Sequence, residues 1–257
     1  MKIKGIAKRW RFPDSSEKQL SVMLQSGVRD LVKRLRDRTK SMKFDASSEE
    51  INTAESDAES LADQLVSAIV AALPALALQI YRFNRKQWVI VAISAGGKDN
   101  LSVRLLQALE DNYVEAWENE LRLQWQDMAE QSVRQLFGNI IADWSSKIRQ
   151  GNFSSQTDGQ VKEMAEQRFV VYRGWAKNRA SGIVGAWNSR LMRQRLQDAG
   201  VSHYFWRGIM DDRERPKHVS WEGKRISLDD IHVFPGEEYG CRCWAVPDFS
   251  TNQENDQ

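Results

Sequence analysis

Cysteine and histidine are scarce in this sequence. Its 257 residues include two cysteines, Cys241 and Cys243, and three histidines. One residue separates the cysteines, so a bridge between them would close a small strained ring, and no disulfide framework can be built. Two unbridged thiols are therefore more consistent with a reducing compartment, or with a bound metal, than with a disulfide-stabilised protein.

Recognisable catalytic motifs are also missing. The sequence has no GxxxxGKS/T loop, no HExxH helix and no GxSxG elbow. No distant Asp or Ser stands at a recognisable spacing from His203, His218 or His232. We therefore predict that the protein is not an enzyme and takes no small-molecule substrate. The alternative is an enzymatic or toxin-like effector domain that uses His218 and the Cys241/Cys243 pair.

The beginning of the chain lacks the apolar run of a signal peptide, because Met1 leads into a basic, polar stretch. The longest uncharged run is Gln64–Tyr81, whose eighteen residues reach the lower limit for a membrane span. It is rich in alanine and contains Pro74. We expect a helix buried against protein here, kinked or broken at Pro74; whether it ever meets a membrane stays open.

Charge is strongly segmented, although the net charge is only +2. Residues 1–43 carry thirteen Lys/Arg against four Asp/Glu, residues 45–63 are purely acidic, and residues 167–197 are purely basic. Basic faces of this kind are able to neutralise the phosphates of double-stranded DNA without reading its sequence. The alternative is solvated helix faces. The candidate contacts are Lys33, Arg34, Arg36, Arg38, Lys40, Arg190, Arg193 and Arg195.

Apolar residues recur at helical spacing through most of the chain. The pattern predicts a first helix from about Asp14, and helical structure from Asn100 as one long helix or two, with Gly138 as a candidate break. A further helix is expected over residues 158–199, ended by Gly200. After it, Tyr204–Ile209 is typical of a strand, and Pro and Gly mark short turns.

These patterns predict a mainly α fold, in which a long-helix body precedes a small irregular α+β C-terminal module. The expected segments are a basic N-terminal helix and acidic joint (residues 1–60), a helical body (61–199), a compact Cys/His-containing module (200–249) and a disordered tail (250–257).

The C-terminal module concentrates the metal-binding residue types of the chain. Zinc favours thiolate and imidazole ligands in tetrahedral sets, and it stabilises modules too small to build their own core. Three ligands would be His218, Cys241 and Cys243. The candidates for the fourth are His232, Glu238 and Asp212. The alternative is that both cysteines are buried as small hydrophobic residues beside a salt-bridged turn.

The same stretch resembles a known signature. Asp212-Arg213-Glu214-Arg215-Pro216-Lys217-His218 is followed by Glu222-Gly223 and by Gly240-Cys241-Arg242-Cys243. This pattern resembles the phage Mu F-like head morphogenesis family, the minor head proteins of tailed bacteriophages. The resemblance covers residues 100–248 and, loosely, the N-terminus. The matching positions are Asp212, Arg213, Arg215, Pro216, His218, Gly223, Gly240, Cys241, Arg242 and Cys243.

One position departs from the family pattern. Many members have His-Pro-Asn before the Cys-Arg-Cys run, where this chain has Glu238-Tyr239-Gly240. If the family's motif binds metal, Glu238 or His232 must replace a favoured ligand here.

The resemblance implies a structural protein of the virion. Its members are low-copy internal head proteins, present in multiple copies per particle and associated with the portal. The partners implied are the portal protein, the major capsid protein or both, and packaged double-stranded DNA. The expected location is the capsid interior near the portal, after assembly in the host cytoplasm, with a role in procapsid assembly or in DNA packaging and ejection. A plain non-specific DNA-binding protein is a further alternative.

Overall fold

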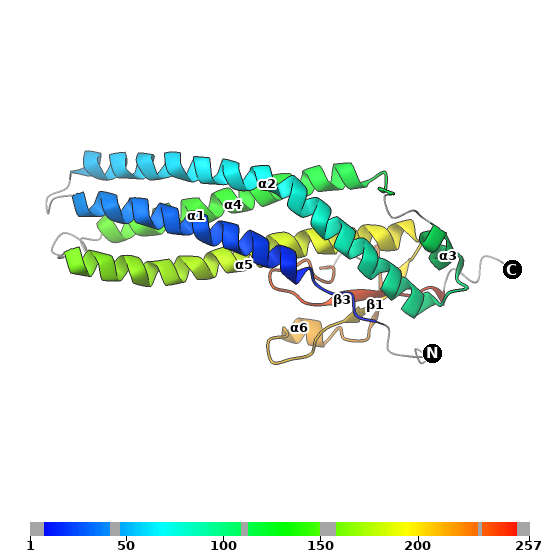
Figure 1. The fold of residues 1–257 in the computed structure, drawn as a ribbon. Helices are drawn as coiled ribbons and strands as arrows, with labels where there is room; N and C mark the ends of the chain where they lie inside the picture. Colours follow the sequence, from blue (N-terminus) through cyan, green and yellow to red (C-terminus); the bar gives the residue numbers. More distant parts are fainter. Residues whose placement is uncertain (1–7, 42–46, 109–112, 150–157, 231–232, 251–257) are drawn as a thin grey trace. The chain divides into compact units, whose positions relative to one another are not determined.

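The computed structural model describes residues 8–41, 47–108, 113–149, 158–230 and 233–250. Within these ranges, helices dominate and three short strands lie near the C-terminus (Figure 1). The mainly α fold with a small α+β module is therefore confirmed. The elements are α1 (Asp14–Ser41), α2 (Ser48–Gly96), α3 (Leu101–Ala108), α4 (Glu118–Arg149), α5 (Asp158–Asp198), β1 (His203–Arg207), α6 (Pro216–Val219), β2 (Arg225–Ser227) and β3 (Trp244–Pro247).

The chain forms two compact units, each assembled from segments far apart in the sequence. One, called here the helical unit, comprises residues 17–76 and 124–183. The other, called the sheet unit, comprises residues 1–16, 77–123 and 184–257. Helices α1, α2, α4 and α5 each contribute to both units. Each unit therefore combines stretches of chain that the contiguous segments expected from the sequence keep apart.

The helical unit packs stretches of α1, α2, α4 and α5 around an apolar core. On α1, residues three or four apart point inward, and Leu20, Leu24, Val28 and Leu31 are fully buried. Indole groups add hydrogen bonds between helices. The Nε1 of Trp144 donates to the Oγ1 of Thr39 at 3.0 Å, and the Nε1 of Trp125 donates to the backbone carbonyl of Ile183 at 2.9 Å.

The region after Asn100 forms two helices, but they do not separate at Gly138. Helix α4 runs without interruption through this glycine, and the chain leaves helical structure before Glu118 instead. The candidate break at Gly138 was therefore wrong. No atom outside the local helix backbone lies within 4 Å of a side chain built at Gly138, so it is an exposed helical glycine that tertiary packing does not require.

Helix α2 contains the long uncharged run and continues through Pro74 without a break. In the described part of the chain, it is the one helix long and apolar enough to cross a membrane by length and composition. Only 33% of its most apolar window is buried. Val66, Ile69 and Leu73 point into the core, whereas Ala71 and Ala75 are exposed. Core helices of soluble proteins pass the same test, so α2 carries no membrane assignment.

The sheet unit is built on an antiparallel sheet with strand order β2-β1-β3. The central strand β1 alternates half-buried and buried residues, and Tyr204 and Trp206 are its buried side chains. Gly200, with φ of 67°, ends α5 and lets the chain turn into β1. Arg207 at the end of β1 pairs with Trp244 at the start of β3. This register places Cys243 beside the end of the central strand.

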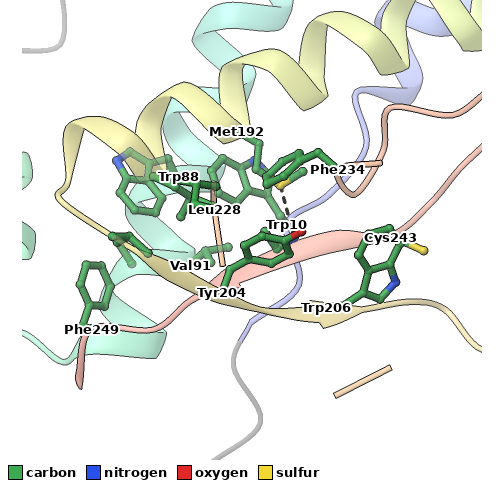
Figure 2. Packing of buried hydrophobic residues seen from close by; sticks show 14 of the residues in the cluster. Trp10, Trp88, Val91, Met192, Tyr204, Trp206, Leu228, Phe234, Cys243 and Phe249 are labelled. Atoms are coloured by element: carbon green, nitrogen blue, oxygen red, sulfur yellow. Dashed lines mark hydrogen bonds between the residues drawn. The ribbon is translucent and has the colours of Figure 1, made fainter. Parts of the chain in front are cut away.

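An aromatic core joins this sheet to the helices of the same unit (Figure 2). Trp10 stacks on Trp88 of α2 at a ring distance of 5.5 Å, and Tyr204 meets Phe234 edge to face at 5.1 Å. Cys241 and Cys243 belong to the same buried cluster. In Figure 2, Cys243 lies with Trp206 at one side of this core. The thiols are thus held within a packed interior.

The sheet unit also contains a buried charge. Arg195 of α5 is only 2% exposed, and its Nε lies 3.3 Å from the Oε1 of Glu115. Its guanidinium also donates to Asn84 and stacks over the ring of Tyr81 at 4.9 Å. Burial lowers the pKa of Arg195 to about 10, against the opposing effect of Glu115. Arg195 therefore belongs to the interior, which corrects the expectation that it contacts DNA.

We expect Arg195→Met to destabilise the protein by about 3–5 kcal/mol, because it leaves the carboxylate of Glu115 buried without its partner. Arg190→Met, at a half-buried position on the same helix, should cost less than about 1 kcal/mol. Denaturant unfolding of the two variants measures the difference. Equal costs would show that the buried pair does not hold this unit together.

Candidate metal centre

The site begins where β1 ends and the chain enters the Asp-Arg-x-Arg-Pro-x-His turn. Pro216 opens the four-residue helix α6 at a position where its fixed φ suits the first helical residue. The turn is closed by backbone bonds from Val219 to Arg215 at 3.0 Å and from Ser220 to Pro216 at 3.1 Å. His218 is carried on this turn and is completely buried.

Two indoles enclose the imidazole of His218. The ring of Trp221 stacks on it at 5.6 Å with an interplanar angle of 18°. Trp206 of β1 lies 5.1 Å away at a steeper angle. These contacts fix the plane of the imidazole and therefore the direction in which its two nitrogens point.

The Nδ1 of His218 points toward both thiols. It lies 3.7 Å from the Sγ of Cys241 and 3.5 Å from the Sγ of Cys243. The three candidate donor atoms all lie within 4.8 Å of one another. The structure therefore brings together the three residues that the sequence singled out as metal ligands.

Glu214 lies beside this group, and the sequence analysis did not include it among the candidate ligands. Its Oε1 lies 3.2 Å from the Nδ1 of His218 and 3.5 Å from the Sγ of Cys243. Its side chain is only 4% exposed, and its Oε2 is buried without a hydrogen-bond partner among the described residues. The available signal was the spacing of four residues from His218, although Glu214 itself precedes α6.

The other candidates for a fourth ligand lie elsewhere. Glu238 contacts the opposite side of the imidazole, with its Oε2 2.9 Å from the Nε2 of His218. Asp212 is exposed. His232 lies outside the described residues.

Neighbouring charges hold the loops that carry these residues. Arg242, between the two cysteines, donates to both carboxylate oxygens of Asp211, at 2.8 and 2.5 Å. This pairing lowers the pKa of Asp211 to about 2. Arg215 lies 3.6 Å from the carboxylate of Glu238 and donates to the carbonyl of Tyr239. Arg213 is largely exposed.

The two thiols are not equivalent. The pKa of Cys241 is lowered, chiefly because it accepts a hydrogen bond from Cys243, and the nearby imidazole acts in the same direction. The pKa of Cys243 is raised, because it donates to the Cys241 sulfur and is buried. Loss of one proton from the pair is thus favoured, and loss of the second is opposed.

The remaining candidate contacts for DNA lie on two helices. On α1, Lys33 and Arg34 are exposed, whereas Arg36 pairs with Asp37 and Arg38 pairs with Asp57. The side chain of Lys40 lies outside the described residues. On α5, Arg190 is half-buried. Arg193 donates to the carbonyl of Leu228 at 3.1 Å and stacks over Phe234, so its guanidinium already has partners within the protein.

The motif glycines serve the turns around the site. Gly223 and Gly240 have φ of 73° and 68°, which L-residues rarely adopt, and no neighbouring atom occupies the space of a side chain at either. Gly240 directly precedes Cys241. It therefore sets the direction in which the Cys-Arg-Cys run leaves the turn.

The same substitution at two glycines should have opposite effects. Gly240→Ala is expected to destabilise the protein by about 1–2 kcal/mol, because an L-residue is strained in the left-handed region. Gly138→Ala in α4 is expected to stabilise it by roughly 0.5–1 kcal/mol, because alanine favours a helix. Denaturant unfolding measures both. Destabilisation by Gly138→Ala would contradict the assignment of an unneeded helical glycine.

The part of the chain that contains this site is similar to a known protein family. Residues 142–246 match the family model described as "Phage Mu protein F like protein". A similar protein of Haemophilus influenzae (strain ATCC 51907 / DSM 11121 / KW20 / Rd), described as "Uncharacterized protein", is 22% identical over 133 residues. The aligned region covers 47% of this chain and 28% of that relative's length. No solved structure matches the chain.

The family match begins within α4 and ends in β3, so it includes α5, His218 and both cysteines. Residues 142–246 are thus similar to the phage Mu F-like family, as the motif from Asp212 to Cys243 indicated.

Proposed function

We propose that the protein is a structural minor head protein of a tailed bacteriophage. In this proposal it is incorporated inside the capsid, in contact with the portal protein, and acts in procapsid assembly or in DNA packaging and ejection. The observation that carries the proposal is the family match over residues 142–246, which includes the whole buried Cys/His/Glu group.

The enclosure of the candidate centre supports a structural role over a catalytic one. His218, Cys241 and Cys243 are each at most 5% exposed. The hollow that touches the two cysteines has a volume of only about 10 Å³, roughly the space of one water molecule. A substrate has no room beside the thiols. The effector alternative would need an opening that the described residues do not provide.

The surface of the C-terminal module supports a contact with another protein. Met210, Val219 and Tyr239 are large side chains that are 39%, 50% and 48% exposed. Val219 follows His218, and Tyr239 follows Glu238, so the buried group fixes the backbone that presents both. Exposed apolar and aromatic side chains on rigid backbone are typical of protein interfaces.

We expect the double variant Val219→Ser/Tyr239→Ser to fold normally but to enter heads poorly when it replaces the wild-type gene in the phage that encodes it. The matched control is Val22→Ser/Leu123→Ser, which removes two equally exposed apolar side chains outside the module. Mass spectrometry of purified procapsids measures incorporation of each. Normal heads, DNA content and infectivity without the gene would refute the assembly role itself.

Contact with packaged DNA is a separate part of the proposal. Lys33 and Arg34 are exposed on α1, whereas the charges of Arg36 and Arg38 are already paired with acids of the chain. Exposed, unneutralised cations release the counterions of DNA when they bind phosphate, so binding should be independent of sequence and sensitive to salt.

Lys33→Gln/Arg34→Gln should lower the slope of log K against log salt for a random-sequence duplex by about 2, since each phosphate contact contributes about 1. Arg36→Gln/Arg38→Gln removes the same formal charge from the same helix and should change the slope less. Fluorescence anisotropy over a salt series measures both variants. Binding without salt dependence, or an equal loss in both, would exclude this surface.

A further inference from the structure

The distances around His218 agree with the dimensions of a tetrahedral zinc site. Zinc binds sulfur at about 2.3 Å and nitrogen or oxygen at about 2.0–2.2 Å. At tetrahedral angles these bond lengths separate N and S by about 3.6 Å, N and O by about 3.4 Å, and S and O by about 3.6 Å. The observed separations are 3.7 and 3.5 Å from the Nδ1 of His218 to the sulfurs of Cys241 and Cys243, 3.2 Å from this nitrogen to the Oε1 of Glu214, and 3.5 Å from that oxygen to the Cys243 sulfur. The group whose donor atoms all lie within 4.8 Å of one another comprises His218, Cys241 and Cys243, so Glu214 would have to move toward the Cys241 sulfur to complete a tetrahedron.

The donor set is also chemically suited to this ion. Zinc binds thiolate, imidazole and carboxylate groups, so two thiolates, an imidazole and a carboxylate supply the four donors of a tetrahedral site. The orphaned Oε2 of Glu214 provides an independent sign of a missing partner, because a buried carboxylate oxygen without a hydrogen bond is costly. A bound cation would compensate the charge of that carboxylate and of the thiolates together.

The far side of the imidazole has the partner expected of a metal-bound histidine. Such a histidine usually donates its other N–H to a carboxylate, which fixes the ring orientation and raises its basicity as a ligand. The Oε2 of Glu238 lies 2.9 Å from the Nε2 of His218, close enough to accept this proton after a small reorientation, because the present geometry leaves this nitrogen without a hydrogen bond. Glu238 thus supports the site through His218 and does not reach the metal position.

We propose that Glu214, His218 through Nδ1, Cys241 and Cys243 bind one zinc ion, and that Glu238 positions His218. This proposal is independent of the head-protein role. The ligands come from two loops separated by more than twenty residues, which flank a sheet whose strands have only three to five residues. Zinc would therefore join the α6 turn to the start of β3 and stabilise a module with a small core of its own.

The test starts with the full-length protein, purified without an affinity histidine tag. Elemental analysis should find one zinc per chain. Chelation should lower the thermal midpoint, and zinc should restore it. Cobalt substituted for zinc should give the visible bands of a tetrahedral site and a near-ultraviolet thiolate-to-cobalt band, which report the two sulfur ligands directly in the folded protein.

Conservative variants then identify the oxygen ligand. Glu214→Gln should weaken zinc binding by at least 10–100-fold in competition with a chromophoric chelator, and should alter the cobalt spectrum. Glu238→Gln should weaken binding about 10–100-fold and leave the tetrahedral bands in place, as expected of an outer carboxylate. Asp212→Asn is the matched control, two residues from Glu214 and exposed, and should leave the affinity unchanged.

Two results would overturn the proposal. If neither the purified nor the reconstituted protein binds stoichiometric zinc, and the thermal midpoint does not respond to chelator or zinc, the group is a metal-free cluster of polar side chains. If zinc binds but Glu214→Gln matches wild type, the fourth ligand is not Glu214. Because Cys241→Ser and Cys243→Ser are at risk of not folding, the cobalt spectrum of wild type decides the sulfur ligands.

Discussion

The C-terminal module depends on keeping four polar groups together in a dry interior. His218 lies against Trp206 and Trp221, and the side chains of Glu214, Cys241 and Cys243 beside it are buried, so water cannot compensate an unpaired charge. Each group is tolerated only through the others, so the α6 turn and the approach to β3 must keep their positions. The surrounding pairs, Arg242 with Asp211 and Arg215 with Glu238, act on the same two loops. The short sheet alone would not impose this arrangement.

Arg195 shows the same constraint at another place in the sheet unit. Its charge is stabilised inside the protein by Glu115, Asn84 and the ring of Tyr81, which come from two segments far from it in the sequence. A buried pair of this kind adds little net stability over an apolar equivalent, but its disruption is costly. It therefore favours one arrangement of α2, α5 and the segment before α4 over other packings of the same apolar residues.

The sequence was informative where the chemistry is local. The periodicity predicted a helix over residues 158–199, and α5 spans Asp158–Asp198 because Gly200 ends it in the left-handed region. The Cys-x-Cys spacing and the nearby histidine predicted a common site for His218, Cys241 and Cys243, and the structure confirms that they meet.

Local sequence patterns gave wrong predictions where contacts with distant residues determine the structure. Nothing near Arg195 indicates its burial, because its acidic partner lies eighty residues away. Gly138 resembles a helix break in the sequence, but the packing of α4 on both sides of it keeps the helix intact. Glu214 was overlooked for another reason. Helix α6 has only four residues, so it gives no periodic signal in the sequence. Only the spacing of four residues between Glu214 and His218 distinguishes the Glu214 carboxylate from that of the exposed Asp212.

The proposed structural role accounts for both the buried polar cluster and the exposed apolar side chains next to it. A catalytic group must reach its substrate, whereas His218 and the two thiols are buried and the hollow beside the thiols has a volume of only about 10 Å³. The same cluster fixes the backbone on which Val219 and Tyr239 are exposed. Rigid presentation of apolar side chains reduces the entropy lost when a partner binds. In the proposed structural role, the cost of burying these polar groups would be offset by the surface that they hold in place, and the buried motif residues would affect a binding partner without touching it.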